Sequence, residues 1–211
     1  MSGSKEENYM NTNKGKSLTK TQKWVLYGLF TAIIVLMTFT PLGYFKTAGV
    51  EITFMMIPVA VGAMIIGPGA GAFLGGVFGI TSFIQAVSGM SAFGAALWAI
   101  NPLYTFIICI PARILAGWIA GLVFKAIYPM KRGKNISFAA GALSASVLNT
   151  VFFVGFLIIL FGRTDYIQSI GTTVPALIAA IVGLNGVIEA CVGFVVGTGI
   201  AKAVHKAIIK E

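Results

Sequence analysis

The chain has 211 residues, of which 57% are hydrophobic and only 10% are charged, and its mean hydropathy is +0.92. Soluble domains carry about 25% charged residues, so this composition excludes an ordinary soluble globule. The formal net charge of +9 comes largely from Lys and Arg that flank apolar runs, which indicates a membrane protein and argues against nucleic acid as a partner.

Six apolar runs predict six membrane-spanning helices. A helix needs about 20 apolar residues to cross a hydrocarbon core. We expect spans over residues 24–39, 52–66, 70–87, 101–125, 136–161 and 173–203, the second being short. Turn signals separate them, such as T-P-L-G at residues 40–43 and G-P-G at residues 67–69.

The basic residues predict the orientation of these spans. Twelve of the fifteen Lys and Arg fall in three clusters, over residues 5–23, 125–134 and 202–210. Cytoplasmic segments are enriched in Lys and Arg, and an even number of crossings puts both ends on one side. We therefore expect an all-α integral membrane protein with both termini in the cytoplasm. We also expect a disordered tail without signal-peptide features over residues 1–23, the six-helix domain over residues 24–205, and a second tail over residues 206–211.

Small residues recur every four positions in several spans. Such stripes let helix backbones approach closely in lipid, and most are expected to pack within the chain. Gly28 and Ala32 are the best candidates for docking to another membrane protein, because the first span is the least constrained by short loops. The other stripes are Gly71, Gly75 and Gly79, then Gly117 and Gly121, then Gly193, Gly197 and Ala201.

Two ionisable residues are expected at membrane depth, where a charge is costly and usually functional. Arg113 lies twelve residues beyond Asn101, or about 18 Å, and Glu189 lies sixteen residues beyond Thr173, or about 24 Å. Two interpretations remain open at this point. Arg113 and Glu189 form a buried ion pair, or Arg113 binds a substrate carboxylate in a bidentate manner while Glu189 orients it.

Amides and aromatic side chains are expected near the same depth or toward the outer side. Together with Arg113 and Glu189 they predict an apolar pocket with a few convergent polar groups. Taken singly, each Asn is equally consistent with a hydrogen bond between helices, and each aromatic residue with the core or the membrane interface. The candidates are Asn101, Asn149, Asn185, Tyr44, Trp98 and Tyr104, with Phe83 and Gln85 beside them.

Motifs for chemistry are missing from the sequence. It has no G-x-x-x-x-G-K-[ST], H-E-x-x-H or G-x-S-x-G motif and no Cys/His spacing for a metal, and Cys109 and Cys191 lie inside apolar runs. A nucleophile with an adjacent base is not presented either. We therefore expect no catalytic residue, no metal and no cofactor, and interpret the chain as a substrate-binding membrane protein without its own energy source.

Several segments resemble one family of membrane proteins. They are T-F-M-M-I-P-V-A-V-G-A-M-I-I-G-P-G-A-G-A-F-L-G-G-V-F-G-I-T-S-F at residues 53–83, N-P-L at 101–103 and I-P-A-R-I at 110–114. The chain is similar in these segments to the substrate-binding S-components of energy-coupling factor (ECF) vitamin transporters. F-T-P-L-G at residues 39–43 and L-N-T at 148–150 look most like the pantothenate-specific branch.

The resemblance implies a six-helix bundle in the bacterial plasma membrane that binds a vitamin near its outer face. It also implies a membrane T-component and two ATPase subunits as partners, with a small-residue contact motif that falls on Gly28 and Ala32. For pantothenate, Arg113 suits the carboxylate, Asn149 and Asn185 the amide or hydroxyls, and Tyr44 and Trp98 the apolar body. The alternatives are a riboflavin, folate or pyridoxine-like vitamin, or a stand-alone channel or scaffold subunit.

Overall fold

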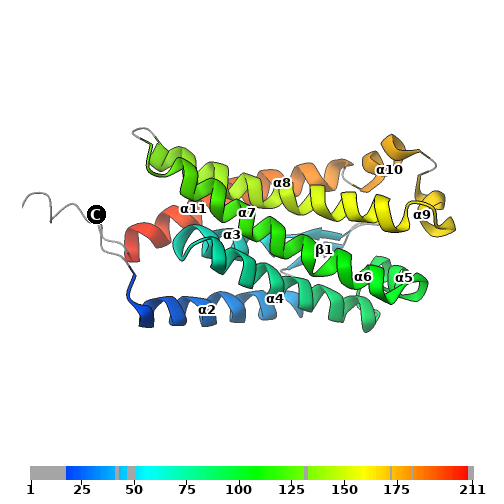
Figure 1. The fold of residues 1–211 in the computed structure, drawn as a ribbon, viewed down its shortest axis with the longest axis horizontal. Helices are drawn as coiled ribbons and strands as arrows, with labels where there is room; N and C mark the ends of the chain where they lie inside the picture. The colour runs from blue at the N-terminus through cyan, green and yellow to red at the C-terminus, as the bar shows by residue number, and fades with distance from the viewer. Residues whose placement is uncertain are drawn as a thin grey trace, which may run out of the picture.

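The computed structural model describes residues 18–40, 43–46, 51–130, 133–171, 173–181 and 183–208. The longer helices run roughly along the long axis of the molecule, with α5 and α9 at one end and the last turns of α11 at the other (Figure 1). The helices are α2 (Lys20–Thr38), α3 (Met56–Ile65), α4 (Pro68–Val87), α5 (Ala92–Ile100), α6 (Pro102–Cys109), α7 (Pro111–Ile127), α8 (Gly133–Phe161), α9 (Asp165–Ile170), α10 (Val174–Ile181) and α11 (Gly183–Ile208).

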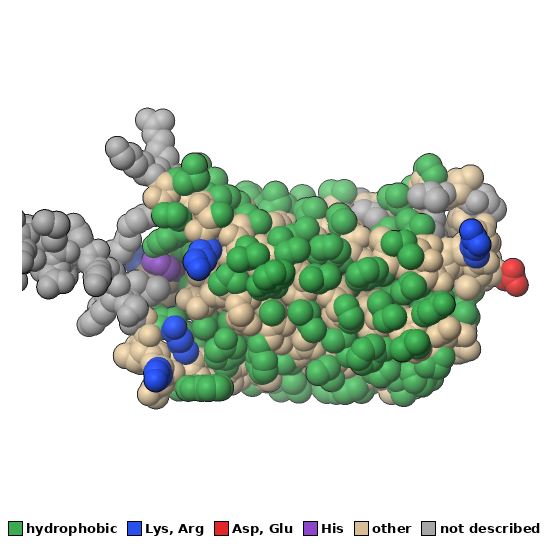
Figure 2. All heavy atoms as spheres, in the orientation of Figure 1, with side chains coloured by type: hydrophobic (Ala, Val, Ile, Leu, Met, Phe, Trp, Pro, Cys, Tyr) green, Lys and Arg blue, Asp and Glu red, His purple; other side chains and the backbone are tan. Residues whose placement is uncertain are grey.

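Five helical segments are long and apolar enough to cross a membrane: Lys20–Thr38, Pro68–Val87, Pro102–Ile127, Ile136–Phe161 and Gly186–Ile208. The expected spans one, three, four and five are therefore confirmed as helices of sufficient length. Figure 2 agrees with this, because hydrophobic side chains cover the middle of the visible face while Lys, Arg, Asp and Glu lie at its two ends. The chain is a multi-pass membrane protein.

The second expected span is shorter than a crossing. Only Met56–Ile65 is helical, and ten residues rise about 15 Å against a hydrocarbon core of about 30 Å. The residues before it form two short strands that the expectation of an all-α chain missed, β1 (Tyr44–Lys46) and β2 (Glu51–Thr53). The strands pair antiparallel, with Tyr44 opposite Thr53.

The sixth expected span contains two described helical segments, α10 and α11, which flank residue 182, and residue 182 itself lies outside the described residues. Within this span, Gly186–Ile208 is long and apolar enough to cross a membrane. Glu189 is the seventh residue of α11.

The first and last described helices extend into the segments that were expected as tails, residues 1–23 and 206–211. Helix α2 begins at Lys20 because Thr19 accepts from the Gln22 backbone N–H at 3.3 Å while the Gln22 side chain accepts from the Thr19 N–H at 2.9 Å. This reciprocal capping stabilises the first turn. Helix α11 runs to Ile208. Residues 1–17 and 209–211 lie outside the described residues.

Helix α3 lies at the centre of the helical packing. Nine of its ten residues are buried, including Val59, Val61 and Ala63, which have no exposed surface. Helix α3 contacts α2, α4, α7, α8 and α11. These five helices therefore form a layer around α3, and their outer faces are left to the lipid.

The glycine stripes of α4, α7 and α11 are packed, as expected for most of them. A Cβ at Gly71 would overlap the Gly117 carbonyl of α7, and a Cβ at Gly79 would lie 2.7 Å from the Cys109 carbonyl oxygen. On α11, a Cβ at Gly197 would lie 3.2 Å from Ala142 of α8. These close approaches fix α7 against α4 and α11 against α8.

The stripe of α2 differs from the others. Gly28 and Ala32 are both exposed, and no atom of the described residues lies within 4 Å of the position that a Gly28 Cβ would take.

Candidate functional site

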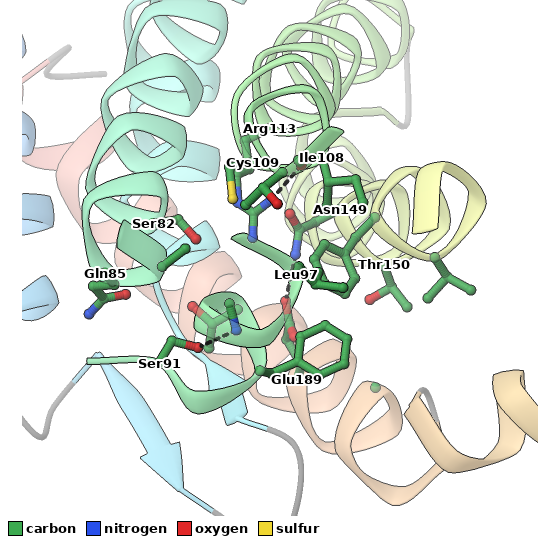
Figure 3. A pocket seen from close by; sticks show the side chains of 18 residues that line it. Ser82, Gln85, Ser91, Leu97, Ile108, Cys109, Arg113, Asn149, Thr150 and Glu189 are labelled. Atoms are coloured by element: carbon green, nitrogen blue, oxygen red, sulfur yellow. Dashed lines mark hydrogen bonds between the residues drawn. The ribbon is translucent and has the colours of Figure 1, made fainter. Parts of the chain in front are cut away.

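One pocket brings together residues from β2 and from six helices. It encloses about 120 Å³ between the last turns of α4 and the facing parts of α5, α6, α7, α8 and α11 (Figure 3). Much of its lining is apolar, with Phe93, Leu97 and Val154 among the walls. The polar side chains that line it are Thr53, Ser82, Gln85, Ser91, Thr105, Arg113, Asn149, Thr150 and Glu189.

Arg113 reaches this pocket because of a helix break next to it. Pro111 has no N–H and therefore cannot donate to the carbonyl four residues earlier, which ends α6 and starts α7. The carbonyl of Ile108 lies at this break and accepts a hydrogen bond from Arg113 Nη1 at 2.8 Å. The break thus supplies a buried acceptor that holds the guanidinium toward the pocket.

Two aromatic rings also hold the guanidinium. Arg113 Cζ lies 4.9 Å from the ring centroid of Phe78 and 5.4 Å from that of Phe153. A cation in such contacts gains about 0.5–2 kcal/mol from each ring, most when it is desolvated. Only 6% of Arg113 is exposed, and its Nε has no hydrogen-bond partner among the described residues. The site therefore holds a positively charged donor that still needs an acceptor.

A second polar group stands beside Arg113. Asn149 Nδ2 of α8 donates to Glu189 Oε1 of α11 at 3.3 Å, and both side chains are buried. Asn149 Oδ1 has no hydrogen-bond partner within the described part of the chain. Figure 3 shows Asn149 between Arg113 and Glu189. The pocket therefore offers an acceptor without a described partner, Asn149 Oδ1, close to a donor without one, Arg113 Nε.

The end of the pocket near α5 is closed by local structure. Gly89 has a φ of +75°, a left-handed conformation that favours glycine, and it turns the chain from α4 into α5. Ser91 caps α5 by accepting from the Gly94 N–H at 3.2 Å. On the other side, Gln85 Nε2 donates to the Thr38 carbonyl at 2.9 Å, which ties this end of α4 to the last turn of α2.

Four of the residues singled out from the sequence meet in this pocket, namely Arg113, Asn149, Glu189 and Gln85. Arg113 and Glu189 are not joined by an ion pair in the described structure, because the guanidinium donates to a carbonyl and the carboxylate accepts from an amide. The structure thus gives different hydrogen-bond partners to the two side chains that the sequence suggested as an ion pair.

The other described candidates lie outside the lining of this pocket. Asn101 caps α6, where its Oδ1 accepts from the Tyr104 N–H at 3.1 Å. The Tyr104 ring makes an edge contact with Phe161, and Trp98 packs against Phe83 at 5.4 Å between ring centroids. The side chains of Tyr44 and Asn185 lie outside the described residues.

Sequence reasoning missed the two rings that contact Arg113, Phe78 and Phe153, and one polar residue of the pocket lining, Ser82. Phe78 and Ser82 precede Gln85 by seven and three residues, which places all three on one face of α4, and Phe153 follows Asn149 by four on α8. Residues at such spacings share a helix face. A search for aromatic residues one turn from each buried polar residue would have found Phe153.

Comparisons with known proteins show which family this chain is similar to. The model of the family described as "ECF transporter, substrate-specific component" matches residues 22–201. A protein named pantothenate transporter PanT from Leuconostoc mesenteroides is 31% identical over 191 residues, which covers 85% of this chain and 90% of that protein. A protein named pantothenic acid transporter PanT from Lactococcus lactis is 29% identical over 167 residues, which covers 75% and 80%.

Proposed function

The chain belongs to the substrate-specific components of ECF transporters, and from this premise we propose that it captures pantothenate for uptake into the cell. The observation that carries the proposal is the pair of unpartnered buried atoms in one pocket, Arg113 Nε and Asn149 Oδ1. A buried polar group without a partner is costly, so such a pair is best explained by a ligand that supplies both partners.

Pantothenate has the groups that this pocket requires. Its carboxylate is a planar anion, which a guanidinium binds through parallel hydrogen bonds, and we assign it to Arg113. Its amide and two hydroxyls supply donors for Asn149 Oδ1, and its branched aliphatic body matches walls such as Leu97 and Val154. The names of the two relatives support the same vitamin.

Energy for uptake is assigned to partner subunits. We propose that a membrane T-component and two ATPases drive transport, and that this chain itself is not an enzyme. In this proposal six segments cross the membrane, with α3 and the strands before it as the second, and both termini face the cytoplasm. The pocket then lies toward the outer side, since it is lined by the start of α11 while Lys202 and Lys206 lie near the end of that helix.

Binding of labelled pantothenate to the purified protein tests the substrate. We expect Arg113→Ala to weaken binding by about ten- to a hundredfold, because a hydrogen bond to a charged group contributes about 1.5–3 kcal/mol. Arg163→Ala is the matched control, since Arg163 is exposed and does not line the pocket. Equal affinity of wild type and Arg113→Ala would contradict the assignment, and a different vitamin retained through purification would contradict the substrate.

Docking to the T-component is assigned to α2, through Gly28 and Ala32. The open surface over Gly28 supports this assignment. We expect Gly28→Leu to reduce co-purification with the T-component while pantothenate binding stays unchanged. Gly199→Leu is the control, because Gly199 of α11 is equally open. Loss of the complex in both variants, or in neither, would argue against docking through α2.

A further inference from the structure

We propose that Glu189 is a positioning residue that sets the direction of the Asn149 amide, so that a ligand has to donate a hydrogen bond to Asn149. Glu189 would act through Asn149 without itself contacting the ligand atom. The inference rests on the proposed function, because pantothenate supplies the donors that it requires. It differs from the role expected from the sequence, in which Glu189 orients Arg113.

The direction follows from the hydrogen-bonding capacity of the two side chains. An ionised carboxylate only accepts, whereas an amide has a donor end and an acceptor end. In the structure the NH₂ group of Asn149 faces Glu189 Oε1 at 3.3 Å, which is the arrangement that an ionised Glu189 requires. Because the amide is planar, its oxygen then points away from Glu189, and Oδ1 is the atom that has no partner among the described residues.

The packing of α11 on α8 holds this pair together. Gly193 lies one turn after Glu189, and a Cβ at Gly193 would overlap the Ser146 hydroxyl of α8. Ser146 lies three residues before Asn149 and is itself buried. The close approach of the two helices one turn away thus keeps the Glu189 carboxylate against the Asn149 amide.

The neighbouring guanidinium has the opposite requirement. Arg113 Nε has no acceptor within the described part of the chain, so the part of the ligand that reaches it has to accept. The pocket therefore distinguishes the two ends of a ligand: an anionic acceptor at Arg113 and a hydroxyl or amide N–H at Asn149. An isomer with these groups exchanged would leave the buried atoms unpaired.

The test compares Glu189→Gln and Glu189→Asp with wild type. Gln is nearly the same size as Glu but can offer either end of its amide, so Asn149 is free to turn over. Asp is shorter but still only accepts. A role in orientation therefore predicts that the function of Glu189 survives better in Asp than in Gln, whereas a role in packing predicts the reverse. Thermal unfolding in detergent establishes that each variant is folded.

The measurement is the dissociation constant of each protein for pantothenate and for analogues. One set of analogues lacks a donor, with the amide N–H replaced by an ester oxygen or a hydroxyl replaced by hydrogen. A control analogue replaces the carboxylate with CH₂OH. In wild type we expect at least one donor-lacking analogue to bind about tenfold or more weakly than pantothenate, the size expected for a hydrogen bond to a buried group.

In Glu189→Gln we expect the donor-lacking analogue to bind only about threefold or less weakly than pantothenate. In Glu189→Asp we expect the difference seen in wild type to persist. Discrimination against the control analogue, which depends on Arg113, should change less than about twofold in both variants. The inference is overturned if Glu189→Gln still discriminates against the donor-lacking analogues as wild type does. It is also overturned if Glu189→Gln loses this discrimination and the discrimination against the control analogue to the same extent. If Glu189→Gln does not fold, loss of donor discrimination in Glu189→Asp overturns it. Wild type that binds no pantothenate overturns the proposed function instead.

Discussion

Replacing Gly75 with Ala should damage both the stability of the bundle and its binding site. The position faces the backbone of α7 at the residue that anchors the ligand in our proposal. A Cβ at Gly75 would lie 2.8 Å from the carbonyl carbon of Arg113 and 3.2 Å from the Ile114 nitrogen, and it would overlap the carbonyl oxygen. Carbon atoms are in favourable contact at about 3.5–4.0 Å, so the carbonyl carbon alone requires the two backbones to separate by at least about 0.7 Å.

The size of the effect follows from this separation. Overpacking of this kind costs about 1–3 kcal/mol, which lowers the unfolding temperature of a chain of this length by roughly 3–10 °C. Functional groups have to be held within about 0.5 Å of their working geometry. We therefore expect Gly75→Ala to weaken pantothenate binding about tenfold or more, through loss of the charged hydrogen bond at Arg113.

Two further glycines serve as controls. A Cβ at Gly76 would lie 3.5 Å from the nearest atom, a side-chain carbon of Ile114, so Gly76→Ala should be neutral or stabilising. A Cβ at Gly121 would lie 2.6 Å from Pro68 Cα. Gly121 is eight residues after Arg113 on α7, which is about 12 Å along the helix axis. Gly121→Ala should therefore lower the unfolding temperature without changing affinity.

The assays are thermal unfolding in detergent and titration with pantothenate. Our reasoning would be refuted if Gly75→Ala and Gly76→Ala behaved alike, because the difference between them depends on the close contact of α4 with the Arg113 backbone. It would also be refuted if Gly75→Ala unfolded early but kept full affinity, because α7 would then move without moving its Arg.

Two other predictions concern the walls of the pocket. Gln85→Leu removes the hydrogen bond to the Thr38 carbonyl and leaves that buried oxygen unpaired. We therefore expect the free energy of unfolding to fall by about 1–3 kcal/mol. The measurement is the unfolding temperature, which should be lower than that of the control variant Ser88→Ala. Phe153→Leu removes one of the two rings beside Arg113 and should weaken pantothenate binding about two- to fivefold. Unchanged affinity in Phe153→Leu, with Phe152→Leu as control, would show that the ring does not stabilise the charge.

Most of the bundle could be predicted because its signals are local. The apolar runs and the Pro and Gly turns marked five of the spans, and the four-residue spacing of Gly71, Gly75 and Gly79 marked the face that packs on α7. The length of the apolar run did not predict the length of α3. A helix at the centre of the bundle is covered by protein on all sides, so its length need not match the thickness of the lipid.

The contacts inside the pocket could not be predicted from the sequence. The rarity of an Arg in a membrane span pointed to Arg113, but its partners come from separate elements: the Ile108 carbonyl of α6, and rings from α4 and α8. The partner of Glu189, Asn149, is forty residues away in sequence, and no local pattern reports such a pair.

The separation of Arg113 from Glu189 explains how a buried cation stays available to a ligand. Had the two formed an ion pair, a ligand carboxylate would have to displace Glu189, and breaking a buried pair costs about 3–5 kcal/mol. A carbonyl and two aromatic rings stabilise the guanidinium without neutralising it, while the Asn149 amide occupies the carboxylate. The charge of Arg113 therefore remains for an acidic substrate, and Glu189 contributes to selectivity without competing for the same site.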